Sequence, residues 1–92
     1  MVRVLIVDDQ IISRQMFEGI VASCDRYRLV DAIPSAKTAD IYCAAGSVDL
    51  ILMDVVMKDG YSGLEAAENI KRSYPNVKII IMTSMPDTKL LA

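Results

Sequence analysis

The sequence contains no histidine and no tryptophan, and it has only two cysteines in 92 residues. The lack of histidine excludes a Ser-His-Asp hydrolase. It also removes the commonest partner ligand for zinc, and the spacing of Cys24 and Cys43 fits no zinc motif. We therefore expect both cysteines to be reduced, small core residues, as is typical of cytoplasmic proteins.

Strong charge and long apolar runs are also missing. The net charge is −2, and no more than two basic residues are neighbours, so no nucleic-acid or anionic-membrane surface is expected within these residues. The longest apolar run, LILMDVVM, is interrupted by Asp54 and is too short to cross a bilayer. The start of the chain lacks the pattern of a secretory signal. The apolar fraction of 53% supports a core, and the length suits one domain.

Hydrophobic periodicity predicts strands that alternate with helices. The segment after the first strand has Ile12, Met16, Ile20 and Cys24 at helical spacing, reinforced by Phe17 and Val21. We expect these residues to face the core. Strands are predicted over residues 2–7, 27–33, 49–53 and 77–82, and helices over 10–24, 36–46, 62–74 and from 84 onward.

Capping residues mark the ends of two predicted helices. Ser35 follows Pro34 and is expected to cap the helix over 36–46, which Gly46 would end. Ser62 and Glu65 have the spacing of a capping box for the third helix. Its core-facing residues are predicted to be Leu64, Ala67, Ile70 and Tyr74.

This alternation indicates an α/β fold, a doubly wound parallel sheet with helices on both faces. The strands at 2–7, 49–53 and 77–82 are nearly continuous in their hydrophobicity, which predicts that both of their faces are covered. The strand at 27–33 is more polar and is expected at an edge of the sheet. Right-handed crossovers place the carboxyl ends of all strands at one edge, where ligands bind in folds of this class.

Polar residues gather at this predicted edge. One strand ends in Asp8 and Asp9, another in Asp54, and the last in Thr83 and Ser84. If these strands are neighbours, their ends lie about 5–10 Å apart, because adjacent strands are separated by roughly 4.8 Å. Three carboxylates so placed repel one another, and either raised pKa values or a bound cation must relieve the repulsion. A hard divalent ion such as Mg²⁺ is the natural solution, because it prefers oxygen ligands. A carboxylate beside the ion can also act as a nucleophile toward phosphorus.

Four motifs, VLIVDDQ, VDLILMDVVM, SGLEA and IIIMTS, resemble the receiver domain of bacterial two-component response regulators in their order and spacing. The resemblance implies a flavodoxin-like receiver fold with strand order 2-1-3-4, the fifth strand being absent from these residues. Residues 1–92 would then be one receiver domain, incomplete at its C-terminal side. The domain would be a cytoplasmic signalling switch and not an enzyme acting on a separate substrate.

The same resemblance implies roles for individual residues. Asp54 would be the phosphoacceptor. Asp8 and Asp9 would hold Mg²⁺, with Mn²⁺ as an alternative, together with Asp54 and the backbone carbonyl of Val56. After Met57 the chain has KDGY without the family's proline and is one residue longer, so the backbone around that carbonyl is expected to differ.

Further roles concern the phosphoryl group and its source. The resemblance implies that Thr83 is the switch hydroxyl and that Ser84 is the small residue beside it. A sensor histidine kinase would supply the phosphoryl group, and phosphorylation would change affinity for a downstream effector domain or protein. The family's phosphate-pairing lysine has no counterpart up to Ala92, and neither Lys58 nor Lys89 occupies its place in the pattern.

The last predicted strand leads to an expectation about association. In the family its outer neighbour would be the fifth strand, so an apolar edge with one charge, Lys78, would remain unpaired in these 92 residues. Such an edge pairs readily with another chain. We expect self-association through this edge or by exchange of terminal elements.

Other interpretations of the acidic residues fit the sequence less well. Asp9 alone suits an N-cap of the first helix. A haloacid-dehalogenase-type phosphatase needs a second aspartate where the chain has Val56, and an EF-hand needs oxygen ligands at Val56 and Lys58. One alternative stays open, a receiver-like module that binds partners without being phosphorylated.

Overall fold

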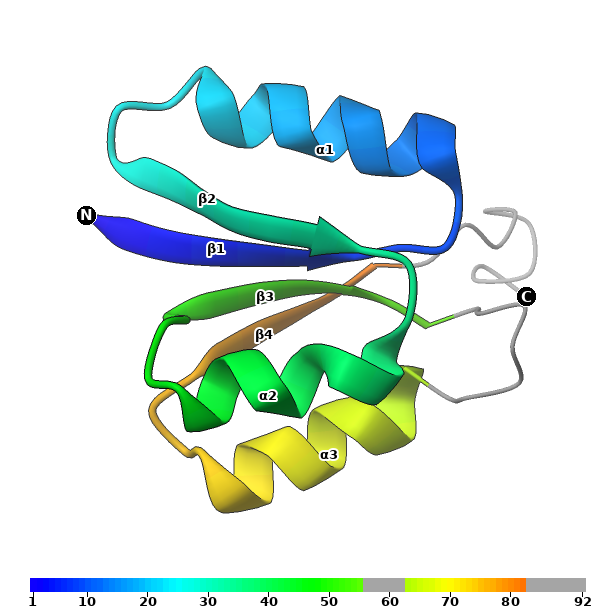
Figure 1. Ribbon diagram of the computed structural model, residues 1–92, viewed down its shortest axis with the longest axis vertical. Helices are drawn as coiled ribbons and strands as arrows, with labels where there is room; N and C mark the ends of the chain where they lie inside the picture. Colours follow the sequence, from blue (N-terminus) through cyan, green and yellow to red (C-terminus); the bar gives the residue numbers. More distant parts are fainter. Residues whose placement is uncertain (56–62, 83–92) are drawn as a thin grey trace, which may run out of the picture.

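Strands and helices alternate along the chain (Figure 1), and the computed structural model describes residues 1–55 and 63–82. All four predicted strands are present, whereas the helix predicted from residue 84 lies outside the described residues. No helix within the described residues is long and apolar enough to cross a membrane. The elements are β1 (Val2–Val7), α1 (Ile11–Ala22), β2 (Tyr27–Ile33), the 3-10 helix η1 (Ala36–Thr38), α2 (Ala39–Ala44), β3 (Leu50–Asp54), α3 (Gly63–Ser73) and β4 (Lys78–Met82).

The strands form one parallel sheet in the order β2-β1-β3-β4, which confirms the predicted fold and strand order. Val4 of β1 lies opposite Leu29 of β2 and Leu50 of β3. The pairing of β1 with β2 shifts register after Val4. The polar strand β2 lies at an edge, as predicted, because an edge strand tolerates exposed side chains that a central strand does not.

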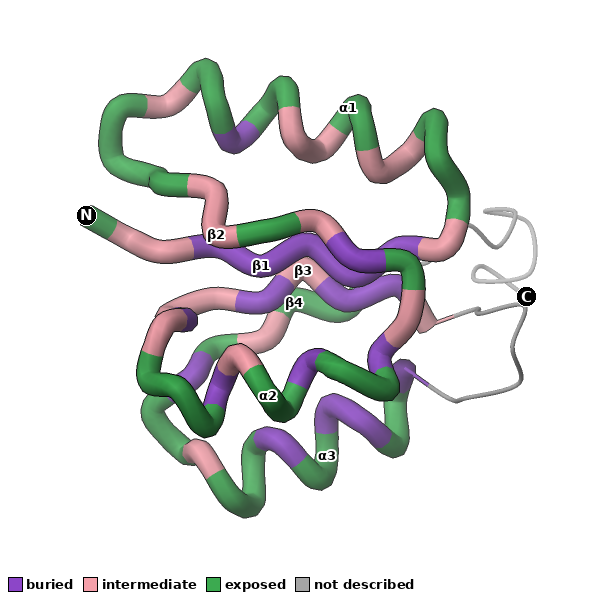
Figure 2. Tube along the Cα trace, in the orientation of Figure 1, coloured by how far each residue is buried: buried purple, intermediate pink, exposed green. Residues whose placement is uncertain are grey.

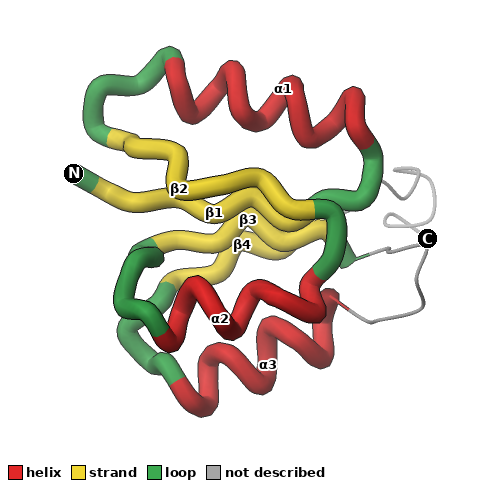
Figure 3. The backbone as a smooth tube through the Cα atoms, in the orientation of Figure 1, coloured by secondary structure: helices red, strands yellow, loops and turns green. Residues whose placement is uncertain are grey.

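Helices α2 and α3 cover one face of the sheet, and α1 covers part of the other (Figures 1 and 3). Successive side chains of a strand point to opposite faces, so β1 contributes to both layers of the core. Buried residues follow β1 and β3 through the centre of the molecule (Figure 2). The layer under α2 and α3 contains Leu5, Val7, Ile51, Met53, Cys43 and Ile70, and the layer under α1 contains Val4, Ile6 and Val21.

Local capping matches the sequence pattern in part. The hydroxyl of Ser35 accepts a hydrogen bond from a backbone N–H two residues later, at 3.2 Å. The helix predicted over 36–46 begins as η1 and continues as α2 to Ala44, so it is shorter than predicted. Gly46 has φ of 70°, the left-handed conformation that favours glycine after a helix. Ser62 of the predicted capping box lies outside the described residues.

The prediction for the buried face of α1 is confirmed for Phe17 and Val21 and wrong for Ile12, Met16 and Ile20. Ile12, Met16 and Ile20 are 83%, 55% and 56% exposed, whereas Val21 is buried and Phe17 packs beside it on the sheet. Both apolar stripes have helical spacing, and they differ in direction by about 100°, the rotation of one residue. Periodicity alone could not decide which of the two faces the sheet.

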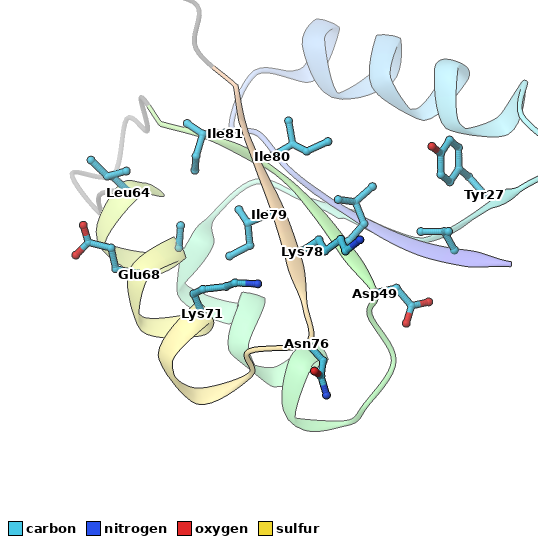
Figure 4. A pocket seen from close by; sticks show the side chains of 13 residues that line it. Tyr27, Asp49, Leu64, Glu68, Lys71, Asn76, Lys78, Ile79, Ile80 and Ile81 are labelled. Atoms are coloured by element: carbon cyan, nitrogen blue, oxygen red, sulfur yellow. The ribbon is translucent and has the colours of Figure 1, made fainter.

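Two further predictions of burial are corrected. Ala67 and Ile70 of α3 are buried, but Leu64 is 49% exposed. The strand at 77–82 was predicted to be covered on both faces, yet Ile80 and Ile81 (Figure 4) are 52% and 41% exposed. The reason is the position of β4 at the edge of the described sheet, where it pairs only with β3, whereas α1 packs chiefly on β1 and β2.

Candidate metal site at the carboxyl edge of the sheet

The end of β1 places two carboxylates at the edge of the sheet. Asp8 is only 3% exposed, and its backbone N–H continues the parallel pairing by donating to the carbonyl of Ile33 at 3.0 Å. Its Oδ1 accepts the backbone N–H of Gln10 at 2.9 Å, and its carbonyl accepts from the Arg14 guanidinium at 2.9 Å. These contacts hold the turn from β1 into α1. Asp9 follows in the same turn and is half-buried.

The N-cap interpretation of Asp9 is not supported. Helix α1 begins at Ile11, and Gln10 occupies the N-cap position with extended backbone angles. In this turn the side chain of Asp8 accepts the backbone N–H of Gln10. Asp9 therefore stands one residue before the capping position.

The third carboxylate belongs to the end of β3. Asp54 is 5% exposed and lies opposite Met82 of β4 in the register. The next residue, Val55, donates its backbone N–H to the carbonyl of Met82 at 3.1 Å, which extends the β3–β4 pairing beyond Asp54. Backbone pairing thus fixes Asp54 at the place where the chain leaves the sheet.

Asp8, Asp9 and Asp54 meet as the sequence predicts. One carboxylate oxygen from each residue can be chosen so that all three lie within 4.8 Å of one another. Two of the three residues are buried, so their mutual repulsion is poorly screened by water. A donor set made only of carboxylate oxygens fits a hard divalent cation such as Mg²⁺ or Mn²⁺ and does not favour a softer metal.

Gly63 shapes the site, and this role was not predicted from the sequence. A Cβ atom at this position would lie 2.1 Å from the carbonyl oxygen of Asp54 and 3.2 Å from the Cα of Val55. The first residue of α3 therefore packs directly on the backbone that carries Asp54. The glycine in SGLEA is the signal that the sequence offers, but capping and resemblance alone do not predict this close approach.

The remaining predicted site residues cannot be placed. Val56, Thr83 and Ser84 lie outside the described residues. The structure therefore brings together the three acids of the predicted constellation and leaves the predicted carbonyl ligand and both hydroxyl residues as expectations.

The fold and the site together define a parallel α/β protein with an acidic cluster where β1 and β3 end. Residues 4–92 match the response regulator receiver domain family, and the chain belongs to that family. Its membership confirms the resemblance seen in the four sequence motifs. A response regulator is a component of two-component signalling systems.

Individual relatives support this assignment. The chain is 36% identical over 92 residues to response regulator UvrY of Escherichia coli O6:H1, covering all of this chain and 42% of the relative. It is 34% identical over 83 residues to response regulator GacA of Pseudomonas viridiflava, covering 90% of this chain and 38% of the relative. The chain thus spans less than half the length of these relatives.

Solved structures agree with the fold. The response regulator TrrA of Thermotoga maritima, crystallised in complex with Mg²⁺ and BeF, superposes with a TM-score of 0.82 at 29% identity. The alignment covers 98% of this chain and 76% of that protein. The receiver fold is therefore shown by sequence and structure alike.

Proposed function

We propose that this domain is a phosphorylation-dependent switch in which Asp54 accepts a phosphoryl group in the presence of Mg²⁺. The observation that carries the proposal is the meeting of three carboxylates within 4.8 Å at the ends of β1 and β3. Membership of the receiver family and the Mg²⁺ complex of the similar protein TrrA support the same interpretation.

The three acids share two tasks in this proposal, binding of the ion and attack on phosphorus. Asp8, Asp9 and Asp54 would hold the divalent ion, with the backbone carbonyl of Val56 as a further ligand. The Asp54 carboxylate oxygen attacks phosphorus and forms a new P–O bond. The P–N bond to the imidazole of a sensor histidine kinase breaks, and its electron pair returns to that imidazole. A bound Mg²⁺ supplies positive charge for the phosphoryl oxygens.

The state of Asp54 then controls a partner. Thr83 turns its hydroxyl toward the phosphoryl group, and Ser84 leaves space beside it. The changed surface alters affinity for a downstream effector domain or protein. We place this exchange in the cytoplasm, where histidine kinases present their phosphoryl groups. The domain acts on its own aspartate and not on a separate substrate.

Labelling with acetyl phosphate tests the proposal. With Mg²⁺, intact protein should gain one acid-stable, base-labile phosphoryl group, and peptide mapping should find it on Asp54. Asp54→Asn should abolish labelling, as should removal of the ion with a chelator. The matched control is Asp25→Asn, because Asp25 is an exposed aspartate outside the acidic cluster.

Two results would contradict the proposal. A label on Asp8, Asp9 or a hydroxyl would assign the chemistry to the wrong residue. Absence of any label in a folded protein, with either acetyl phosphate or a kinase, would favour the alternative module that binds partners without phosphorylation.

A further inference from the structure

Three hydrogen bonds hold Asp8 in the turn between β1 and α1. Its backbone N–H donates to the carbonyl of Ile33 at 3.0 Å, and its Oδ1 accepts the backbone N–H of Gln10 at 2.9 Å. Its carbonyl oxygen accepts the third bond, from Nη1 of Arg14 at 2.9 Å. The donor in this third contact is a side chain, so the contact depends on which residue α1 carries at that position.

Arg14 reaches the turn from a fixed place on α1. The helix begins at Ile11, and the backbone N–H of Arg14 donates to the carbonyl of Gln10 at 2.9 Å. Side chains of a helix point toward its N-terminus, so a long side chain here returns to the preceding turn. The residue is half-buried, and the planar guanidinium loses less conformational freedom for each hydrogen bond than a lysine would.

The peptide group that Arg14 holds joins two of the three acids. The carbonyl of Asp8 and the N–H of Asp9 belong to one planar unit, because rotation about the bond between them is strongly hindered. A fixed carbonyl therefore sets the direction in which the backbone continues through Asp9. The carboxylate of Asp8 has a separate restraint, the bond from Gln10. The guanidinium contact thus acts on Asp9 more than on Asp8.

We propose that Arg14 is a positioning residue for the cation site and acts through Asp9. The inference rests on the proposed function, because it concerns the acids that would hold the divalent ion. Three carboxylates within 4.8 Å of one another repel each other before an ion arrives. The contact from Arg14 keeps Asp9 in the cluster against this repulsion.

The charge of Arg14 has the opposite effect on ion binding. Its guanidinium lies 2.9 Å from the carbonyl oxygen of Asp8, and a positive charge there repels an incoming cation. Loss of the guanidinium would strengthen ion binding if charge were the main effect, and weaken it if position were. We expect position to dominate, because water and salt screen a half-exposed charge. The sign of the change therefore separates the two effects.

Binding of Mn²⁺, followed by the electron paramagnetic resonance of the free ion, tests the inference without phosphorylation. Arg14→Met should raise the dissociation constant about tenfold, as is typical when a group that orients a metal ligand is lost. The matched control is Arg26→Met, which makes the same change in charge and should bind as the parent does. Arg26 is exposed, and its carbonyl accepts the N–H of Val2 at the opposite end of β1. Circular dichroism should show that both variants are folded.

A double-mutant cycle identifies the acid through which Arg14 acts. In an Asp9→Asn background, Arg14→Met should change the Mn²⁺ affinity by less than about twofold, because the carboxylate that it positions is gone. In an Asp8→Asn background the effect should remain about tenfold, because asparagine can still accept the N–H of Gln10. A general weakening of the turn would instead lower the affinity equally in both backgrounds.

Labelling of Asp54 by acetyl phosphate gives a second readout. Arg14→Met should raise the Mg²⁺ concentration for half-maximal labelling about tenfold and leave the rate at saturating Mg²⁺ unchanged. The reason is that Asp54 belongs to β3 and not to the turn that Arg14 holds.

The outcomes separate this inference from the proposed function. Unchanged or tighter Mn²⁺ binding by Arg14→Met would overturn the inference and leave the proposed function standing. Equal effects in the two aspartate backgrounds would overturn the action through Asp9. A parent protein that binds neither ion would overturn the proposed function and the inference together. If Arg14→Met does not fold, Arg14→Gln replaces it with the same expected outcomes, because glutamine keeps a polar side chain at this half-buried position.

Discussion

Replacement of Gly63 by alanine should damage both the fold and the site. The added Cβ would lie 2.1 Å from the carbonyl oxygen of Asp54 and 3.1 Å from its carbonyl carbon. Both are backbone atoms in a paired strand, so no side-chain rotation relieves the overlap. Overpacking of a close-packed interior costs about 1–3 kcal/mol. We expect a loss of stability at the upper end of this range, because the first turn of α3 must move.

Gly19→Ala is the matched control for this substitution. Gly19 lies in the exposed part of α1, and a Cβ there meets nothing within 4 Å. Alanine inside a helix is favoured over glycine by about 0.5–1 kcal/mol, so this variant should be slightly more stable than the parent. Urea denaturation followed by circular dichroism measures both changes.

The rate at which acetyl phosphate labels Asp54 provides a second, independent test of the steric argument. A displaced Asp54 backbone should slow labelling of Gly63→Ala by acetyl phosphate under conditions where the protein is fully folded, whereas Gly19→Ala should be labelled at the parental rate. A Gly63→Ala variant with parental stability and parental labelling would refute the steric argument.

Two further predictions concern titratable groups away from the cluster. Hydrogen bonds from Arg3 lower the pKa of Asp49 to about 2, so this pair stabilises the fold above the ordinary pKa and loses its effect as the pH falls toward 2. In Arg3→Met the free energy of unfolding should therefore change less with pH between the ordinary pKa of aspartate and pH 2. Urea denaturation at several pH values measures this change. Burial raises the pKa of the Cys43 thiol, so a thiol reagent at neutral pH should modify Cys24 first and Cys43 only on unfolding.

The sheet could be predicted from sequence because several independent sequence patterns indicate the same arrangement of strands and helices. The central strands are almost wholly apolar, and the helices between them impose parallel pairing. Backbone pairing then carries Asp8 and Asp54 to one edge, so the acidic cluster follows from strand order alone. No knowledge of side-chain packing was needed for that step.

The prediction failed where two faces of one element were both apolar. On α1 the stripe containing Ile12 and the stripe containing Val21 are equivalent as patterns, and only packing on the sheet separates them. The role of Gly63 was missed for a related reason. The sequence does not distinguish this glycine from other glycines in helices. Its role follows only from the contact between Gly63 and the backbone of β3, which the structure shows.

The two adjacent acids at the end of β1 have different explanations. Asp8 serves the fold directly, since its carboxylate accepts the backbone N–H of Gln10 and its carbonyl accepts from Arg14. Asp9 does not occupy the N-cap, which belongs to Gln10, so helix capping does not account for its charge. Its carboxylate instead joins those of Asp8 and Asp54, an arrangement that repulsion and desolvation disfavour. Helix capping therefore does not explain Asp9, whereas the proposed function does, because its carboxylate belongs to the cluster that would hold the divalent cation.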